Sequence, residues 1–98
     1  YGTGHSEFIV GKALASHRGQ VVIATKFGFD VNEAKKHVTR YSKDAEVLLN
    51  LRRDCEDSLR RLNMDYIDLY QLHVWDYPME LADSLVDALE TLVQEGKI

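Results

Sequence analysis

Two short apolar segments alternate with longer segments whose apolar residues recur every three or four positions. Val21–Lys26 and Tyr66–Leu72 are rich in β-branched, aliphatic and aromatic residues and contain neither Gly nor Pro. This composition predicts that Val21–Lys26 is a strand buried on both faces and that Tyr66–Leu72 is a strand buried on most sides, as in parallel sheets covered by helices. The predicted order is helix, strand, helix, strand, helix, which is typical of α/β folds in which crossover helices join parallel strands.

The first two helical segments carry signals for their ends and for their packing. Ser6 is a suitable N-cap for the first helix, and Gly11 within that helix favours a close approach to another element. The second helix is expected over residues 42–62, with Ser42 as its cap and Asn63 as a left-handed residue that ends it. Its apolar stripe at helical spacing comprises Leu48, Leu51, Cys55, Leu59 and Leu62.

The third helix and the longest connection complete the pattern. Apolar residues from Leu81 to Val93 recur at helical spacing, and Gly96 is a suitable C-terminal stop. The polar segment Asp30–Tyr41 shows no clear period, so we expect a long loop with one helical turn at Asn32–His37. Loops of this length in compact domains are often functional.

Composition narrows the class of protein. The chain has 98 residues, 45% of them hydrophobic and 29% charged, which is ordinary for a globular domain. A net charge of −4 argues against a nucleic-acid partner, and no apolar run reaches the roughly 18 residues of a membrane span. The single cysteine, Cys55, excludes an internal disulfide and fits a reducing, cytoplasmic location. The histidines lack the spacing of metal ligands, so we expect no metal.

Several polar or aromatic residues stand where chemistry is expected. Lys26 and His73 each end a predicted strand, and α/β folds place their active sites at that edge. Lys26 is either a catalytic lysine or a charge that marks the strand end. His73 is either a group that orients or protonates a substrate, or a histidine bonded to the backbone. Trp75, in the following loop, either lines a pocket or covers the end of the fold. Tyr1 could act as a general acid, although an exposed loop tyrosine rarely does.

Four stretches resemble the aldo-keto reductase family. They read Y-G-x-G-x-S-E at Tyr1–Glu7, I-A-T-K-F-G at Ile23–Gly28, S-L-R-R-L-x-x-D-Y-I-D-L-Y-Q-L-H at Ser58–His73, and A-L-x-x-L-V-x-x-G-K-I at Ala88–Ile98. The third stretch is the most specific. All four occur in the order and at the spacing of the family, over nearly the whole chain.

The resemblance implies a TIM (β/α)8 barrel that reduces aldehydes and ketones with a nicotinamide cofactor, usually NADPH. On this resemblance Tyr1 donates a proton to the carbonyl oxygen, and the ammonium of Lys26 makes the phenol a stronger acid. His73 would hydrogen-bond and orient the small carbonyl substrate, and Trp75 would lie near that substrate. The resemblance also implies that most cofactor contacts come from outside this chain.

The resemblance further implies that residues 1–98 are a fragment of a single barrel domain. About three βα units, from the N-terminal half region, are expected, with the flanking units missing. The aspartate that pairs with the family's lysine would lie upstream of Tyr1. Because an incomplete barrel leaves open strand edges, we expect the isolated chain to be inactive and prone to self-association. Two other readings remain open: a regulatory or channel-associated subunit that binds NADPH without turnover, and a self-standing α/β interaction domain.

Overall fold

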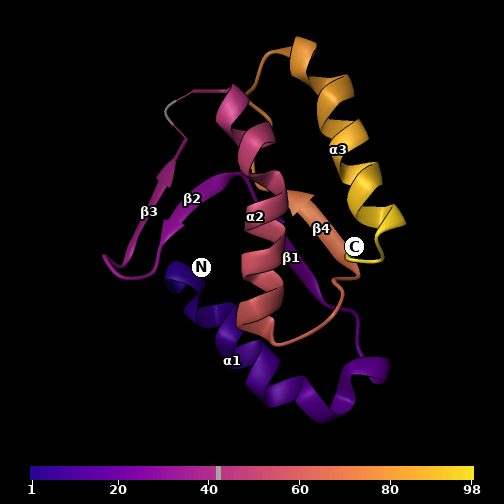
Figure 1. Ribbon diagram of the computed structural model, residues 1–98. Coiled ribbons are helices and arrows are strands. Elements are labelled where there is room, and N and C mark those ends of the chain that lie inside the picture. Colours follow the sequence, from indigo (N-terminus) through magenta and orange to yellow (C-terminus); the bar gives the residue numbers. More distant parts are fainter. Residues whose placement is uncertain (42) are drawn as a thin grey trace.

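Two parallel strands lie at the centre of the computed structural model, which describes residues 1–41 and 43–98. Strands β1 (Ala24–Phe27) and β4 (Leu69–Leu72) pair in parallel. Helix α2 (Ala45–Leu62) lies between them in sequence and crosses one face of their sheet (Figure 1). The predicted parallel pairing is confirmed, although each strand is shorter than the apolar segment that predicted it.

The β1–β4 sheet is covered on one face only. On the covered face Phe27 is buried, and its ring stacks on that of Tyr70 at a centroid distance of 4.7 Å. On the opposite face Leu69 is 49% exposed, and Ala24 and Gln71 are exposed as well. The expectation that the Val21–Lys26 strand is buried on both faces, and the Tyr66–Leu72 strand on most sides, is therefore wrong for the described residues. Side chains alternate across a strand, and no element of residues 1–41 and 43–98 covers the second face.

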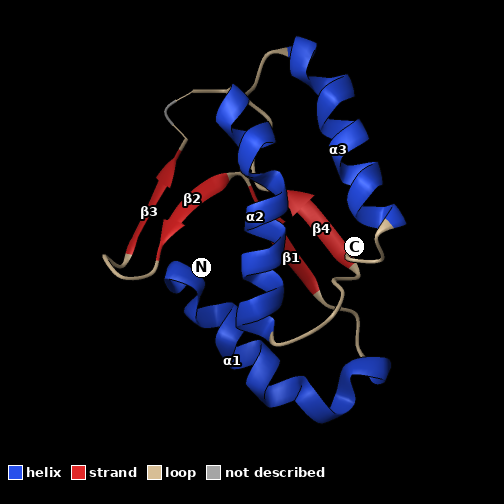
Figure 2. Ribbon diagram, viewed as in Figure 1, coloured by secondary structure: helices blue, strands red, loops and turns tan. Residues whose placement is uncertain are grey.

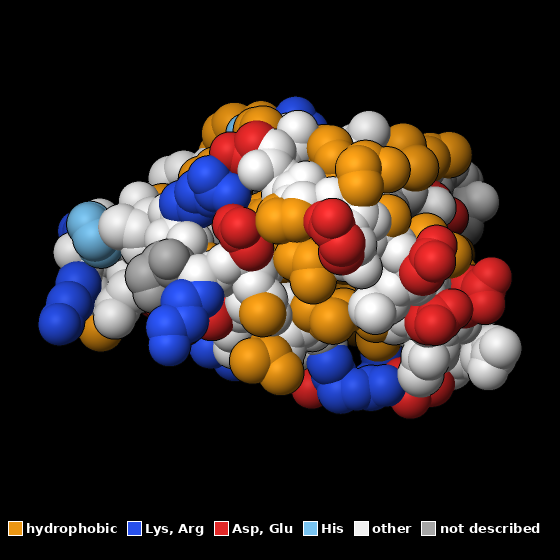
Figure 3. Space-filling model, turned by 90° about the horizontal axis from the view of Figure 1, so that it is seen from above, with side chains coloured by type: hydrophobic (Ala, Val, Ile, Leu, Met, Phe, Trp, Pro, Cys, Tyr) orange, Lys and Arg blue, Asp and Glu red, His pale blue; other side chains and the backbone are white. Residues whose placement is uncertain are grey.

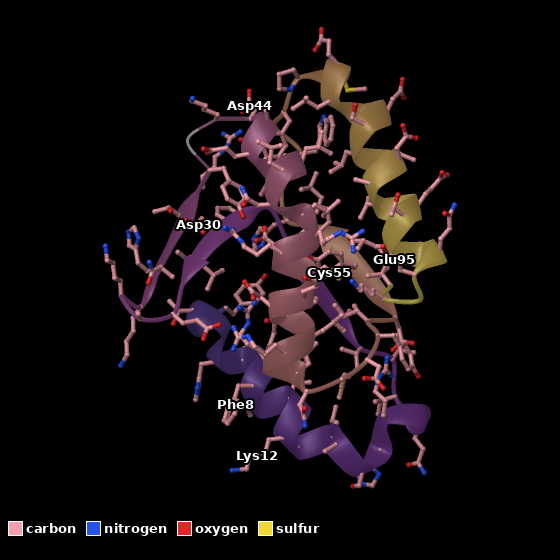
Figure 4. The ribbon with its side chains drawn as sticks, in the orientation of Figure 1. Phe8, Lys12, Asp30, Asp44, Cys55 and Glu95 are labelled. Carbon is pink, nitrogen blue, oxygen red and sulfur yellow. The ribbon has the colours of Figure 1, made fainter. Side chains whose placement is uncertain are left out.

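Helix α2 supplies most of the core through its apolar stripe. Leu51, Cys55 and Leu62 are at most 2% exposed. Cys55 projects from the side of α2 that faces β4 and α3 (Figure 4). The stripe predicted from the sequence is thus confirmed as the buried side of the helix.

The ends of α2 agree with the sequence where they are described. Asn63 adopts the left-handed conformation with φ 52° and ends the helix, as predicted. At the other end Asp44 precedes the first helical residue, and the backbone N–H of Lys43 donates to Glu46 Oε2 at 3.1 Å. The predicted cap, Ser42, lies outside the described residues.

Helix α1 (His5–Leu14) packs against α2 at the point where it has no side chain. A Cβ added to Gly11 would lie 2.2 Å from the carbonyl oxygen of Leu62, so the predicted close approach is confirmed. The helix already includes Ser6, so the prediction of Ser6 as N-cap is wrong. After Leu14 the chain continues as the 3-10 helix Ala15–Gln20.

A second sheet occupies the segment predicted to be a loop. Strands β2 (Phe29–Asn32) and β3 (His37–Arg40) form an antiparallel hairpin directly after β1 (Figure 2). The predicted loop over Asp30–Tyr41 is therefore wrong, and the expected helical turn is instead the hairpin's turn. Lys36 takes φ 51° there, and the N–H of Lys35 donates to Asn32 Oδ1 at 2.9 Å.

Tyr41 anchors this hairpin to α2. Its hydroxyl donates to Asp54 Oδ2 at 2.6 Å, and Arg53 donates to the same hydroxyl at 2.8 Å. Burial and the Asp54 carboxylate hold the pKa of Tyr41 far above its usual range. Burial likewise raises the pKa of the Asp54 carboxyl, against the opposing effect of its hydrogen bonds to Tyr41 and Arg53. The phenol is consequently a neutral donor in this contact.

Helix α3 (Ala82–Gln94) closes the other side of α2. It buries Leu85 and Leu92, and Gly96 follows it with φ 74°, as expected for a C-terminal stop. Arg52 of α2 donates to both carboxylate oxygens of Glu95, at 2.6 and 2.8 Å. This bidentate pair joins α2 to the residue that follows α3.

The surface is mixed in character. Seen from above, Asp and Glu side chains gather over the α3 side, and hydrophobic side chains remain visible between charged ones (Figure 3). Phe8 and Lys12 project outward from α1 (Figure 4). None of the helices in residues 1–41 and 43–98 has the length and apolarity needed to cross a bilayer.

Candidate active site

The carboxyl ends of β1 and β4 bring the two predicted strand-end residues to one edge. Lys26 is the penultimate residue of β1, and His73 directly follows β4. The backbone N–H of His73 donates to the carbonyl oxygen of Phe27 at 2.9 Å, which extends the parallel pairing to this position. Both side chains are exposed at the edge where parallel α/β folds place their chemistry.

Tyr1 joins this edge from the other end of the sequence. The 3-10 helix η1 (Gly2–Gly4) carries the tyrosine over the end of β1, and Lys26 Nζ donates a hydrogen bond to Tyr1 Oη at 3.0 Å. The rings of Tyr1 and His73 lie 5.8 Å apart. Tyr1, Lys26 and His73, which are far apart in sequence, thus form one constellation. The tyrosine side chain is 74% exposed, so solvent reaches its hydroxyl.

A pocket of about 350 Å³ opens beside this constellation. Tyr1, Lys26 and His73 border it, and the hairpin supplies an apolar wall that consists of Phe29, Val31 and Val38. The Phe29 ring meets the His73 ring edge-on at 5.0 Å and 78°. Sequence reasoning missed this wall because it assigned the segment to a loop. The alternation of Phe29 and Val31 with polar residues was the available signal.

A polar cluster forms the pocket's floor between α1, β1 and α2. Glu7 accepts from Thr25 Oγ1 and from Arg61 Nε, and Arg61 also contacts Glu33 and Ser58. Burial acts to lower the pKa of Arg61, but its hydrogen bonds to Glu7 and Glu33 raise it above the ordinary value. In the sequence Glu7 stands out only as an acid in the first turn of a helix.

Trp75 lies apart from this pocket. Its ring contacts that of Tyr77 edge-on at 6.1 Å, and the described residues that line the pocket do not include it. The Tyr77 hydroxyl donates to the carbonyl oxygen of Gly28 at 3.3 Å. In the same loop Asp76 pairs with Arg40 of β3 at 2.7 Å, so the loop after His73 is fastened to the hairpin.

The whole chain matches the model of one protein family. This model, described as "Aldo/keto reductase family", matches residues 1–98. The chain belongs to the aldo/keto reductase family. This confirms the family resemblance drawn from the four sequence stretches.

Curated relatives cover the whole chain. Aldo-keto reductase YhdN of Bacillus subtilis is 40% identical over 100% of this chain and 28% of its own length. The putative aryl-alcohol dehydrogenase AAD14 of Saccharomyces cerevisiae is 39% identical over 100% of this chain and 27% of its own length. The chain therefore spans little more than a quarter of the length of these two relatives.

Solved structures agree in fold. Aldo-keto reductase AKR11C1 from Bacillus halodurans, in its holo form, superposes with a TM-score of 0.75 at 39% identity and covers 98% of this chain and 30% of that chain. Glycerol dehydrogenase AKR11B4 from Gluconobacter oxydans gives a TM-score of 0.70 at 41% identity, over 97% of this chain and 28% of that chain. The parallel pair and its helices are thus part of an aldo/keto reductase TIM barrel.

Proposed function

We propose that this chain carries the catalytic constellation of an NADPH-dependent reductase that converts aldehydes or ketones to alcohols. The observation that supports it is the 3.0 Å hydrogen bond from Lys26 Nζ to Tyr1 Oη beside His73, at the carboxyl edge of two parallel strands. Three groups with complementary roles meet there in an open pocket. Each role follows from the chemistry of a carbonyl group that gains negative charge.

Tyr1 is the proton donor in this proposal. When bound, the reduced nicotinamide supplies the hydride. As charge builds on the carbonyl oxygen, that oxygen takes the hydroxyl proton of Tyr1, and the neighbouring Lys26 ammonium stabilises the phenolate that remains. Solvent returns the proton to the exposed phenolate. A ring N–H of His73 holds the carbonyl oxygen in place and adds a hydrogen bond that strengthens as charge develops.

The residues that line the pocket are better suited to the nicotinamide ring of NADPH than to its phosphate groups. Lys26 and His73 leave exposed polar atoms at a pocket with an apolar wall, which suits a flat nicotinamide ring and a carbonyl compound. The two arginines that border the pocket, Arg53 and Arg61, already pair with carboxylates. In this proposal the phosphate contacts come from elsewhere in the barrel.

The same proposal makes residues 1–98 part of a single barrel domain whose isolated form is inactive. Leu69 and Val22 stay exposed on the open face of the sheet, and the strand edges have no partner among the described residues. Such a surface favours self-association of the isolated segment. The free, buried Cys55 fits a reducing, cytoplasmic compartment.

A small aromatic or apolar carbonyl compound is the proposed substrate class. Phe29, Val31 and Val38 give the pocket an apolar wall next to His73. Desolvation of an aryl or alkyl group on this wall would contribute to binding without a specific polar contact. Two similar proteins, the putative aryl-alcohol dehydrogenase AAD14 and the glycerol dehydrogenase AKR11B4, are named for different substrates.

The test is NADPH-dependent reduction of benzaldehyde by the complete reductase that contains this segment. We expect turnover that falls at least about 100-fold in Lys26→Met, because the ammonium that stabilises the phenolate is lost. Lys35→Met removes a lysine in the hairpin turn, away from the pocket, and should leave turnover unchanged. Saturable NADPH binding with no carbonyl turnover would overturn the proposal and favour a regulatory subunit.

A further inference from the structure

Tyr1, the proton donor of the proposed reaction, directly precedes a strained turn, Gly2–Gly4. Gly2, Thr3 and Gly4 all have positive φ, at 58°, 55° and 93°. Thr3 is the only one of the three with a side chain, and the left-handed region costs such a residue roughly 1–2 kcal/mol. The carbonyl oxygen of Tyr1 accepts from the N–H groups of Gly4 and Ser6 at 3.2 and 3.4 Å. Strained backbone of this kind persists only where its surroundings fix it.

Within residues 1–41 and 43–98, the packing around the tyrosine does not provide that fixation. Its side chain is 74% exposed, and its described polar contact is the hydrogen bond from Lys26. The position of the hydroxyl therefore depends on how the turn is held against β1. A displacement of about 1 Å at a reacting group can lower a rate by about 100-fold.

Glu7 ties the turn to the strand that bears Lys26. One carboxylate oxygen accepts from Thr25 Oγ1 at 2.5 Å, and the other accepts from Arg61 Nε at 2.6 Å. Thr25 is the residue before Lys26 in β1, and Glu7 lies in the first turn of α1, directly after the strained turn. The Glu7 side chain is only 12% exposed, so these hydrogen bonds form in a partly desolvated place where they are worth more.

Arg61 completes the clamp from α2. Its side chain is 10% exposed and lies directly on the turn, because a Cβ added to Gly4 would be 2.4 Å from Arg61 Cδ. Arg61 also donates to Glu33 at 3.0 Å and to Ser58 at 3.3 Å, which orients its guanidinium. One carboxylate thus links α1, β1 and α2 around the turn that carries Tyr1.

We propose that Glu7 is a positioning residue whose carboxylate, shared by Thr25 and Arg61, keeps Tyr1 Oη within hydrogen-bond distance of Lys26 Nζ. This inference rests on the proposed function. Its role is geometric, since Glu7 does not touch the reacting atoms. A glutamine at this position can accept from Arg61 Nε and donate to Thr25 Oγ1, and it would keep the geometry without the charge.

The experiment compares steady-state benzaldehyde reduction by variants of the complete reductase. Glu7→Ala should lower kcat about 10- to 100-fold while KM and the dissociation constant for NADPH change less than about threefold. Glu7→Gln should restore most of kcat. Glu56→Ala is the matched control, because it removes a half-exposed carboxylate of α2 that pairs with Lys97 and Arg52, away from the pocket, and should keep kcat within about twofold.

Several results would overturn this role. A folded Glu7→Ala with the wild-type kcat would do so, as would equal losses in Glu7→Ala and Glu56→Ala, or no recovery in Glu7→Gln. If Glu7→Ala does not fold, Thr25→Val removes only the hydrogen bond to β1, and a wild-type kcat in that variant would refute the proposal. Tyr1→Phe distinguishes a failure of the proposed function from a failure of the positioning role. If Tyr1→Phe keeps full turnover, the proposed function is wrong. If Tyr1→Phe loses turnover while Glu7→Ala keeps it, only the positioning role is wrong.

Discussion

The contact between α1 and α2 at Gly11 makes a sharp prediction about stability. A Cβ at this position would lie 2.2, 2.6 and 2.7 Å from the O, C and Cα atoms of Leu62, all of them backbone. The helices must separate by about 1 Å to relieve the overlap, and overpacking of this kind costs about 1–3 kcal/mol or more. Alanine's higher helix propensity returns at most about 1 kcal/mol. We therefore expect Gly11→Ala to destabilise the fold by about 1–3 kcal/mol.

Urea denaturation of the complete reductase, followed by circular dichroism, measures this change. Gly19→Ala is the matched control, because a Cβ there has no neighbour within 4 Å, and it should be neutral or slightly stabilising. Since α1 also carries the turn of Tyr1, Gly11→Ala should lower kcat as well. A Gly11→Ala protein as stable as Gly19→Ala would refute the close-packing argument.

Three further predictions concern other parts of the chain. Burial raises the pKa of the Cys55 thiol from 9.0 to about 11. The free energy of unfolding should therefore fall by about 2–3 kcal/mol as the pH rises from 9 through 11, because the thiol ionises first in the unfolded chain. Iodoacetamide should label the thiol at about pH 8.5 in urea but not in the native protein. Phe29→Ala should raise KM for benzaldehyde more than KM for acetaldehyde, because the larger aryl group loses more apolar contact. Equal effects on the two KM values in steady-state assays would contradict the proposal that the apolar wall binds the substrate. The isolated 98-residue chain should show no saturable quenching of Trp75 fluorescence by NADPH, and micromolar binding would contradict the proposal that the cofactor's phosphate contacts come from elsewhere in the barrel.

Local signals in the sequence predicted several features correctly. Gly11 indicated a close helix approach, Asn63 indicated a left-handed helix end, and the apolar stripe of α2 indicated its buried side. Each of these depends on the properties of one residue or one helix period. For the same reason the strand ends at Lys26 and His73 could be located before the structure was known.

Features that depend on tertiary context were missed. The hairpin β2–β3 has only Phe29 and Val31 as an apolar alternation, and Tyr41 anchors it through Asp54 on a distant helix. The open face of the β1–β4 sheet could not be read from composition, because the same apolar residues suit a strand covered on both sides. The contact of Glu7 with Arg61 joins residues 54 positions apart and carries no local pattern.

The most direct test of the account is a single-turnover experiment on Tyr1→Phe in the complete reductase. The protein is saturated with NADPH and mixed with benzaldehyde, and the oxidation of the cofactor is followed by absorbance. Because Lys26 Nζ lies 3.0 Å from Tyr1 Oη and the variant removes only that hydroxyl, the rate should fall at least about 100-fold with NADPH affinity unchanged. A rate within about threefold of wild type would show that Tyr1 is not the proton donor.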